Sequence, residues 1–153
     1  MSFASFDDRG LISVCPACAQ KNRIPYEHLG EVGHCGSCKG EIPPPSVPLE
    51  MDSAARLTRI IAASPIPVVV DYWAPWCGPC RAVAPELEKV AARGSGQYLV
   101  VKVNTEALPQ VGERFQIRGI PTLAVFNNGT EAARSSGARP AAAIEQFIRE
   151  SIG

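Results

Sequence analysis

The six cysteines of this chain fall into three Cys-x-x-Cys pairs: Cys15/Cys18, Cys35/Cys38 and Cys77/Cys80. Pairs at this spacing are typical of metal sites and of catalytic dithiols. A framework of structural disulfides is the alternative. It is less favoured because the last two thirds of the chain contain enough apolar residues to bury a core without cross-links.

The third pair lies in the segment Trp76-Cys77-Gly78-Pro79-Cys80, where a buried strand is expected to end and a helix to begin. Free N–H groups at a helix N-terminus stabilise an anion, so we expect a lowered pKa for the Cys77 thiol. Cys80 falls on the same helical face, and Gly78 and Pro79 suit a first helical turn. This arrangement predicts thiol–disulfide exchange, in which Cys77 attacks a protein disulfide and Cys80 resolves the mixed disulfide. Half of a metal site is the alternative.

A candidate acid–base group for this chemistry is Asp71, which lies within the apolar run 68–73. An unpaired carboxylate inside a buried strand is costly, so the pKa of Asp71 should rise. A carboxyl group that titrates near neutrality is suited to take the proton of Cys80. The pattern alone leaves two other readings open, a structural hydrogen-bonded carboxylate and a residue on an exposed face.

The four remaining cysteines predict one structural zinc ion. Sixteen residues separate the pair Cys15/Cys18 from the pair Cys35/Cys38, which is a spacing typical of four-cysteine zinc sites. Metal binding would also explain how a segment with few large apolar residues folds, since it contributes on the order of 10 kcal/mol. Redox-active cysteines and an iron site are the alternatives. His34 adjoins Cys35 but is not needed as a ligand.

The distribution of apolar residues and prolines predicts two units and a linker. Residues 1–42 form the cysteine-rich module, residues 43–48 a proline-rich linker, and residues 49–153 an α/β domain. In the domain, hydrophobic periodicity predicts helices and strands in alternation. The expected strands are 68–73, 98–103, 122–127 and 131–135, and the expected helices begin near 54, 78, 108 and 141. This order predicts a mixed central sheet with helices on both faces.

Composition excludes several classes of function. The 153 residues carry 15 basic and 15 acidic side chains, a balance that gives no support for binding nucleic acid or an anionic membrane. No stretch has the apolar length of a membrane-spanning helix, and the first fourteen residues lack the apolar core of a secretory signal. We therefore expect a cytoplasmic protein whose thiols are kept reduced.

Taken together, the motifs of the second unit resemble those of the thioredoxin family. The resemblance covers roughly residues 49–153 and is carried by 70–80, Ala84-Pro85, 101–104, 118–123, Asn128-Gly129 and Gly137. It implies a thioredoxin fold, with Cys77 as the attacking thiol, Cys80 as the resolving thiol and Asp71 as the buried acid–base group. Lys102 matches a lysine near this acid, although a solvated lysine at a strand end is the alternative.

The same resemblance implies where substrates bind. Pro121 matches a cis-proline that faces the dithiol, where an extended substrate segment can pair with the backbone. The expected substrate-binding residues surround it on a flat apolar patch: Trp76, Gly78, Pro79, Ile120, Pro121 and Gly137.

A four-cysteine module in front of such a domain resembles the zinc-containing thioredoxin 2 subfamily. The Gly-Pro dipeptide between Cys77 and Cys80 resembles that of reducing members of the family. The resemblance implies a monomeric reductase of protein disulfides that binds no organic cofactor and is itself reduced by an NADPH-dependent thioredoxin reductase. A second hypothesis is a binding or sensor module that releases zinc on oxidation.

Overall fold

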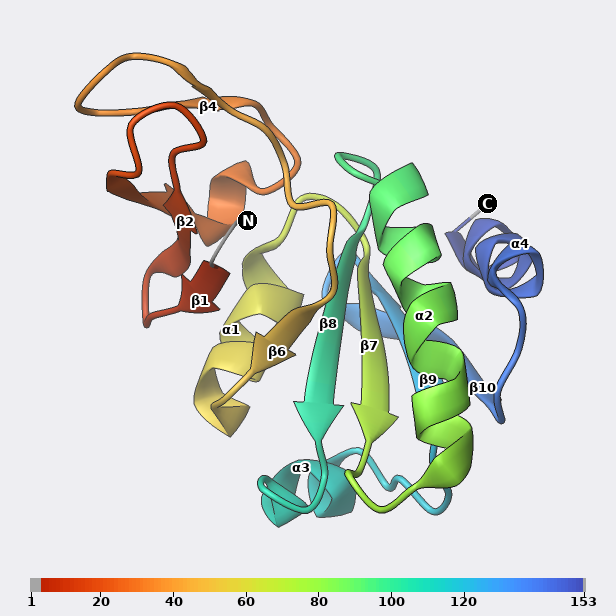
Figure 1. Cartoon of the computed structure of the whole chain (residues 1–153). Helices are drawn as coiled ribbons and strands as arrows, with labels where there is room; N and C mark the ends of the chain where they lie inside the picture. The colour runs from red at the N-terminus through yellow and green to blue at the C-terminus, as the bar shows by residue number, and fades with distance from the viewer. Residues whose placement is uncertain (1–3, 153) are drawn as a thin grey trace.

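The computed structural model describes residues 4–152 and contains an N-terminal cysteine-rich module (Figure 1). Its strands β1, β2 and β3 form an antiparallel sheet, followed by a short 3-10 helix, η1, and a two-stranded pair of β4 and β5. The bounds are Ala4–Phe6 for β1, Gly10–Val14 for β2, Lys21–Pro25 for β3, Tyr26–His28 for η1, Gly33–His34 for β4 and Glu41–Ile42 for β5.

The second unit contains a five-stranded mixed sheet in the order β10-β9-β7-β8-β6. Strands β6, β8 and β7 are parallel, whereas β9 runs antiparallel to β7 and pairs with β10 in a hairpin. The strands are β6 (Leu49–Met51), β7 (Val68–Trp73), β8 (Leu99–Asn104), β9 (Thr122–Asn127) and β10 (Thr130–Ser136). The helices are α1 (Ala54–Ala63), α2 (Gly78–Arg93), α3 (Pro109–Arg114) and α4 (Ala141–Ile152). The predicted mixed sheet is confirmed.

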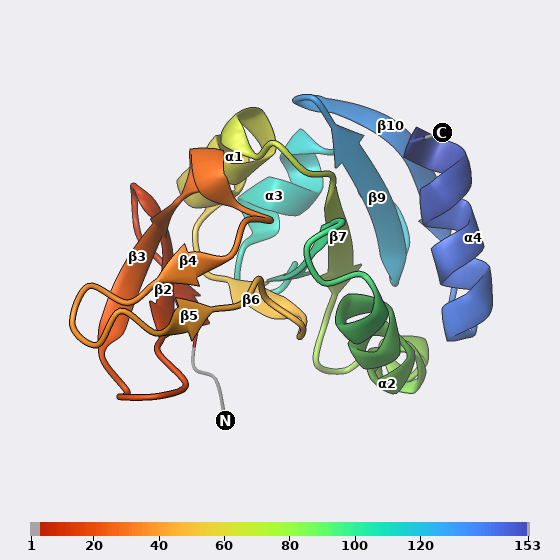
Figure 2. The ribbon, with the colours of Figure 1, turned by 90° about the horizontal axis from the view of Figure 1, so that it is seen from above.

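Helices cover both faces of this sheet, with α1 and α3 on one side and α2 and α4 on the other (Figure 2). Side chains alternate along β7. Val70 and Tyr72 therefore pack in the cluster of α1 and α3, and Val69 packs in the cluster of α2 and α4. By the same alternation, Asp71 and Trp73 lie on the α2 side. Strand β7 is buried on both faces, because helices pack against its side chains on each side of the sheet.

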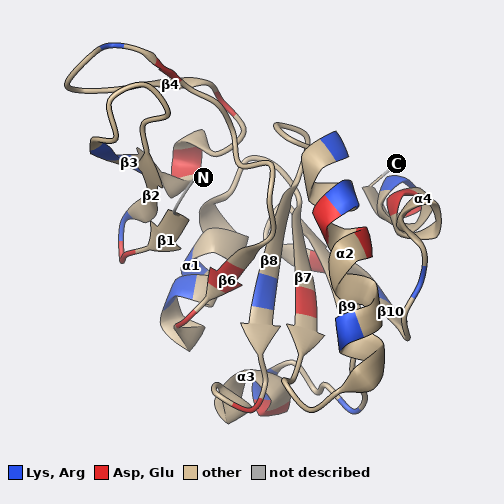
Figure 3. Ribbon diagram, viewed as in Figure 1, with Lys and Arg blue, Asp and Glu red and all other residues tan. Residues whose placement is uncertain are grey.

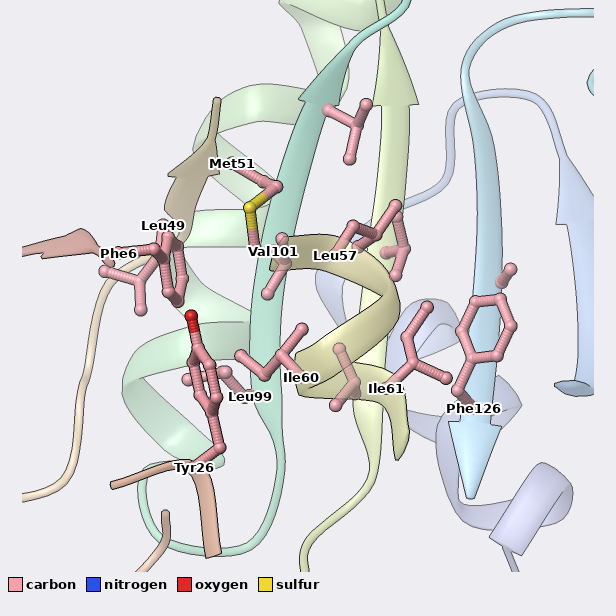
Figure 4. Packing of buried hydrophobic residues seen from close by; sticks show 14 of the residues in the cluster. Phe6, Tyr26, Leu49, Met51, Leu57, Ile60, Ile61, Leu99, Val101 and Phe126 are labelled. Carbon is pink, nitrogen blue, oxygen red and sulfur yellow. The ribbon is translucent and has the colours of Figure 1, made fainter. Parts of the chain in front are cut away.

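The cysteine-rich module packs against the edge of the domain at α1 and β6. Tyr26 and Phe6 are buried in the same cluster as Leu57 and Ile60 of α1 (Figure 4). Arg56 strengthens this contact, since its Nη1 donates a hydrogen bond of 3.0 Å to the carbonyl of Phe6. The apolar residues of the module, too few for a core of their own, are thus buried in a core shared with the domain.

Local signals explain where α1 begins. The Ser53 side chain accepts a hydrogen bond of 3.3 Å from the backbone N–H of Arg56, as expected of an N-cap residue. The helix expected to begin near residue 54 therefore starts directly after Ser53. Across residues 4–152, no helix combines the length and the apolar character that crossing a membrane requires.

Candidate active site and candidate metal centre

The third cysteine pair lies at the junction between β7 and α2. Cys77 is the N-cap of α2, and its Sγ accepts a hydrogen bond of 3.2 Å from the backbone N–H of Cys80. The two residues form a disulfide, with Cα atoms 5.3 Å apart, and both are buried. An N–H directed at this sulfur is a favourable partner for a thiolate, because the free amides of a helix N-terminus stabilise negative charge. The arrangement therefore suits a pair that cycles between dithiol and disulfide.

Residues 120–121 and 137 lie beside this disulfide. The Ile120–Pro121 peptide bond is cis, and the carbonyl oxygen of Ile120 is 3.8 Å from Cys77 Sγ. Gly137, with a φ of 94°, donates its N–H to the carbonyl of Pro121 over 2.9 Å. Trp76 is 68% exposed next to Cys77. The structure thus brings together, around one buried disulfide, residues that the sequence places far apart.

Asp71 is the buried acid on the α2 side of β7. Only 1% of this residue is exposed, and its Oδ1 is buried without a hydrogen-bond partner among residues 4–152. Desolvation raises the pKa of Asp71 to about 7; the positive charge of Lys102 acts in the opposite direction, and the negative charge of Glu50 adds to the rise. The burial of Asp71 is inconsistent with an exposed position, and within residues 4–152 no hydrogen bond of the kind expected for a structural carboxylate reaches its Oδ1.

Lys102 pairs directly with Asp71 across the β7–β8 ladder and with Glu50 across the β6–β8 ladder. The basic band on β8 lies between the acidic bands on β7 and β6 (Figure 3). The Lys102 ammonium is 4.7 Å from the centre of the Trp73 ring, and the Trp73 Nε1–H donates a hydrogen bond of 3.2 Å to Glu50. Sequence reasoning missed Glu50. The alternation Leu49-Glu50-Met51, buried, exposed and buried, is the only signal, and it is three residues long.

The first two cysteine pairs converge in the N-terminal module. The sulfur atoms of all four residues, Cys15, Cys18, Cys35 and Cys38, lie within 4.8 Å of one another. Two pairs of sulfurs, each joining one loop to the other, are 3.6 Å apart. Four sulfurs around a tetrahedral zinc ion with bonds of about 2.3 Å would be roughly 3.8 Å apart. The donor set and its spacing therefore fit a four-thiolate metal site, and His34 is not part of the cluster.

Both cysteine loops have the same backbone form. The N–H of Ala19 donates to the carbonyl of Cys15, and the N–H of Lys39 donates to the carbonyl of Cys35, over 2.9 and 3.0 Å. Ala19 and Lys39 both have positive φ, at 66° and 65°. The two loops are therefore equivalent turns, each of which presents two sulfurs to the space between them.

Hydrogen bonds favour the anionic state of Cys35, which a metal ligand requires. Its pKa is lowered to about 6, chiefly because the backbone N–H of Cys38 donates to its sulfur. Asn22 contributes as well: its Nδ2 donates to Cys35 Sγ over 3.4 Å, and its Oδ1 accepts the N–H of Gly36 over 2.9 Å. The same Nδ2 also donates to the carbonyl of Gln20. One asparagine thus ties the two loops together at the cluster.

Comparisons with known proteins match both units of the chain. The family model described as Thioredoxin matches residues 48–150, and the model described as Thioredoxin 2, N-terminal matches residues 14–40. "Thioredoxin C-3" of Corynebacterium nephridii is 38% identical over 143 residues, which cover 93% of this chain and 96% of that protein. "Thioredoxin 1" of Synechococcus elongatus is 48% identical over 86 residues, which cover 56% of this chain and 80% of that protein.

Among solved structures, chloroplastic thioredoxin z superposes with a TM-score of 0.63 at 33% identity, covering 69% of this chain and 96% of that one. A mutant thioredoxin from Halobacterium salinarum superposes with a TM-score of 0.65 at 25% identity, covering 71% and 94%. The chain belongs to the thioredoxin family. It is a thiol–disulfide oxidoreductase with an N-terminal zinc-ribbon module, as the sequence predicted.

Proposed function

We propose that this thioredoxin reduces protein disulfides with Cys77 as the attacking thiol, Cys80 as the resolving thiol and Asp71 as the acid–base group. The observation that carries the assignment is the position of Cys77 at the N-cap of α2, where the Cys80 N–H is 3.2 Å from its sulfur. Cys77 is thereby the sulfur whose negative charge the helix stabilises. Cys80, inside the first turn, is the sulfur that must lose a proton during the reaction.

The proposed reaction begins when the Cys77 thiolate attacks one sulfur of a substrate disulfide. A mixed disulfide forms, and the second substrate sulfur leaves as a thiolate that takes a proton from water. The Asp71 carboxylate then accepts the proton of Cys80, either directly or through a water molecule. The Cys80 thiolate attacks Cys77 Sγ, and the substrate sulfur that was bonded to Cys77 leaves as a thiolate, which takes a proton from water. Two electrons pass to the substrate, and the Cys77–Cys80 disulfide remains.

The face around Cys77 is the proposed substrate-binding surface. An extended substrate segment would lie along the backbone near Pro121, as an added strand does at a sheet edge. The exposed Trp76 ring offers apolar contact area on the other side of the disulfide. The remaining residues of this proposed surface are Gly78, Pro79, Ile120 and Gly137.

We propose zinc as the metal of the N-terminal module, held by the thiolates of Cys15, Cys18, Cys35 and Cys38. Four thiolates in a closed tetrahedral set are typical of structural zinc, which would supply folding energy to the module. We further propose that the module spans residues 1–42 and the thioredoxin domain residues 49–153, joined by residues 43–48. The segment 43–48 is held against the domain where Ser95 Oγ donates to the carbonyl of Pro44 over 3.1 Å.

The proposed partners are oxidised proteins in the cytoplasm and an NADPH-dependent thioredoxin reductase that regenerates the dithiol. We propose that the protein acts as a monomer and binds no organic cofactor. Membership of the thioredoxin family and the buried Cys77–Cys80 disulfide support this cycle.

The test is reduction of insulin disulfides in the presence of NADPH and a thioredoxin reductase. We expect Cys77→Ser to lose at least about a thousandfold in rate, because no thiolate remains to form the mixed disulfide. Cys80→Ser should accumulate a covalent mixed disulfide with insulin. Undiminished turnover by Cys77→Ser would contradict the proposed roles.

A further inference from the structure

Glu50 lies on β6, the edge strand of the sheet, two strands away from Asp71. Its side chain is exposed to solvent, yet its carboxylate accepts a hydrogen bond of 3.2 Å from the indole of Trp73. Trp73 is the last residue of β7 and packs against Ala74, Cys77 and Cys80. The Trp73 indole N–H thus donates to Glu50, which belongs to β6 and not to the β7–α2 segment that carries the dithiol.

Lys102 connects Glu50 to Asp71. It is partly buried on β8, between the two acids, and its ammonium group lies over the Trp73 ring, 4.7 Å from the centre. In the part of the chain that the structure describes, Lys102 forms no ion pair within 4.0 Å. The face of this ring is therefore the contact that fixes the position of the cation, since the negative face of an indole attracts an ammonium group.

These four residues form a row from the buried interior to solvent. Asp71 is almost fully buried, Trp73 and Lys102 are partly exposed, and Glu50 is exposed. All four belong to the α2 side of the sheet, because paired residues of neighbouring parallel strands point to the same face. The acid–base group proposed for Cys80 thus has a continuous set of charged and aromatic neighbours that ends at the surface of β6.

We propose that Glu50 is a positioning residue for proton transfer at the dithiol, which holds the Trp73 ring and shares the Lys102 cation with Asp71. This inference rests on the proposed acid–base role of Asp71. Without Glu50, Lys102 would act on one carboxylate only, and Asp71 would stay ionised over a wider pH range. With Glu50 present, the Lys102 cation interacts with two carboxylates and stabilises the charge of Asp71 less. Asp71 can then exchange a proton near neutral pH.

The charges that act on Asp71 are consistent with a Lys102 cation shared by the two acids. Desolvation raises the pKa of both acids, and the Lys102 cation lowers the pKa of both, whereas the charge of Glu50 adds to the rise at Asp71. On the other side of β7, Leu123 of β9 is the paired neighbour and carries no charge. The dithiol at the start of α2 and the phenol of Tyr98 are titratable groups packed on the α2 face, and Trp73 packs against the cluster that contains both cysteines.

The experiment measures the titration of the Asp71 carboxyl by carbon-13 NMR in the reduced protein. Glu50→Gln removes the charge but keeps an oxygen that can accept the Trp73 N–H. We expect the pKa of Asp71 to fall by about half a pH unit or more, and the fall to shrink in high salt. Glu88→Gln, at an exposed position of α2, is the matched control for one lost charge and should leave the titration unchanged.

Glu50→Ala separates the hydrogen bond from the charge. It removes the acceptor as well, so the Trp73 ring is released and Lys102 loses its fixed position. We expect the Nε1–H resonance of Trp73 to move in Glu50→Ala and to stay near its wild-type position in Glu50→Gln. The fall in the pKa of Asp71 should be smaller in Glu50→Ala than in Glu50→Gln.

An unchanged or raised Asp71 pKa in Glu50→Gln overturns the inference while the proposed function stands. The proposed function is tested separately by Asp71→Asn. If that variant reduces insulin with the same rate and pH profile as the wild type, the acid–base role of Asp71 fails, and the inference about Glu50 fails with it.

Discussion

The Cys-x-x-Cys pattern occurs in two settings in this molecule, and the surroundings of each pair decide its chemistry. At Cys77 and Cys80 the pair begins a 16-residue helix, and two sulfurs bond to each other in a buried position. In the N-terminal module, two pairs occupy equivalent turns that face each other, so each sulfur has three further sulfurs within 4.8 Å. Both kinds of pair receive backbone N–H groups that favour thiolates. The number of facing sulfurs therefore separates metal binding from redox chemistry.

The two sites also differ in the polar side chains that surround the sulfur atoms. The redox pair follows β7, the strand that carries Asp71, a buried acid whose Oδ1 has no hydrogen-bond partner within residues 4–152. The module instead contains Asn22, which donates to one sulfur and fixes the turn that follows it. Proton transfer needs a group that can change its charge, whereas a structural metal site needs fixed donors. Each of these neighbours suits the chemistry proposed for its site.

The largest expected effect comes from removing one metal ligand. Cys35→Ser should abolish stoichiometric zinc binding, which is worth on the order of 10 kcal/mol in isolated zinc modules, and should lower the melting temperature. The melting temperature should fall because Phe6 and Tyr26 of the module share the core of the domain. Zinc content and thermal unfolding are the measurements, with Ser37→Ala in the same turn as the control. Zinc retained at one equivalent by Cys35→Ser would contradict the four-thiolate site.

The next effect concerns the buried acid of the redox site. The pKa of Asp71 is raised in the folded protein, from 3.8 to about 7, so the folded state binds more protons than the unfolded state between these values. The stability contributed by this group is therefore fully present at low pH and is lost as the pH rises from about 4 to 7.

Asp71→Asn removes this loss, and we expect it to raise the free energy of unfolding at pH 8 by about 2–4 kcal/mol and to change it little at pH 4. Denaturant unfolding of the oxidised protein at both pH values measures the difference. Asp52→Asn, at an exposed position, should change stability by less than about 0.5 kcal/mol at either pH. Equal effects of Asp71→Asn at the two pH values would contradict a raised pKa.

The smallest of the three effects comes from a neighbour of the metal ligands. Asn22→Ala should weaken zinc binding by about 10- to 100-fold, because groups that orient metal ligands contribute on this scale. Competition with a chromogenic chelator gives the affinity. Gln20→Ala, two residues earlier and without a side-chain contact to sulfur, is the control. Reduction of insulin should be unchanged in both variants, and an equal loss of affinity in Gln20→Ala would remove the special role of Asn22.

The sequence predicted the chemistry of both sites because the residues that carry it are local in the chain. The spacing of the cysteines, the apolar run 68–73 and the Asn128-Gly129 turn are short patterns, and the strands and helices of the second unit formed close to their expected positions. The mixed sheet was predictable for the same reason. The position of Asp71 inside an apolar run marked it as a candidate, and the resemblance to the thioredoxin family implied its role.

The parts that the sequence did not reveal depend on contacts between distant segments. Strand β6 is only three residues long and exists because it pairs with β8, so Glu50 could not be placed beside Lys102 in advance. The burial of Phe6 and Tyr26 in the domain core likewise follows from how the module packs on α1. Local patterns carry no information about such pairings.

Native mass spectrometry tests most directly whether the Cys77/Cys80 pair and the four-cysteine module differ in chemistry. The reduced, zinc-loaded protein first reacts with one equivalent of a disulfide substrate. We expect one disulfide, between Cys77 and Cys80, and one zinc ion still bound to the four thiolates of the module. A disulfide among Cys15, Cys18, Cys35 and Cys38 with loss of zinc, while Cys77 and Cys80 stay reduced, would contradict the proposed division between a redox pair and a metal site.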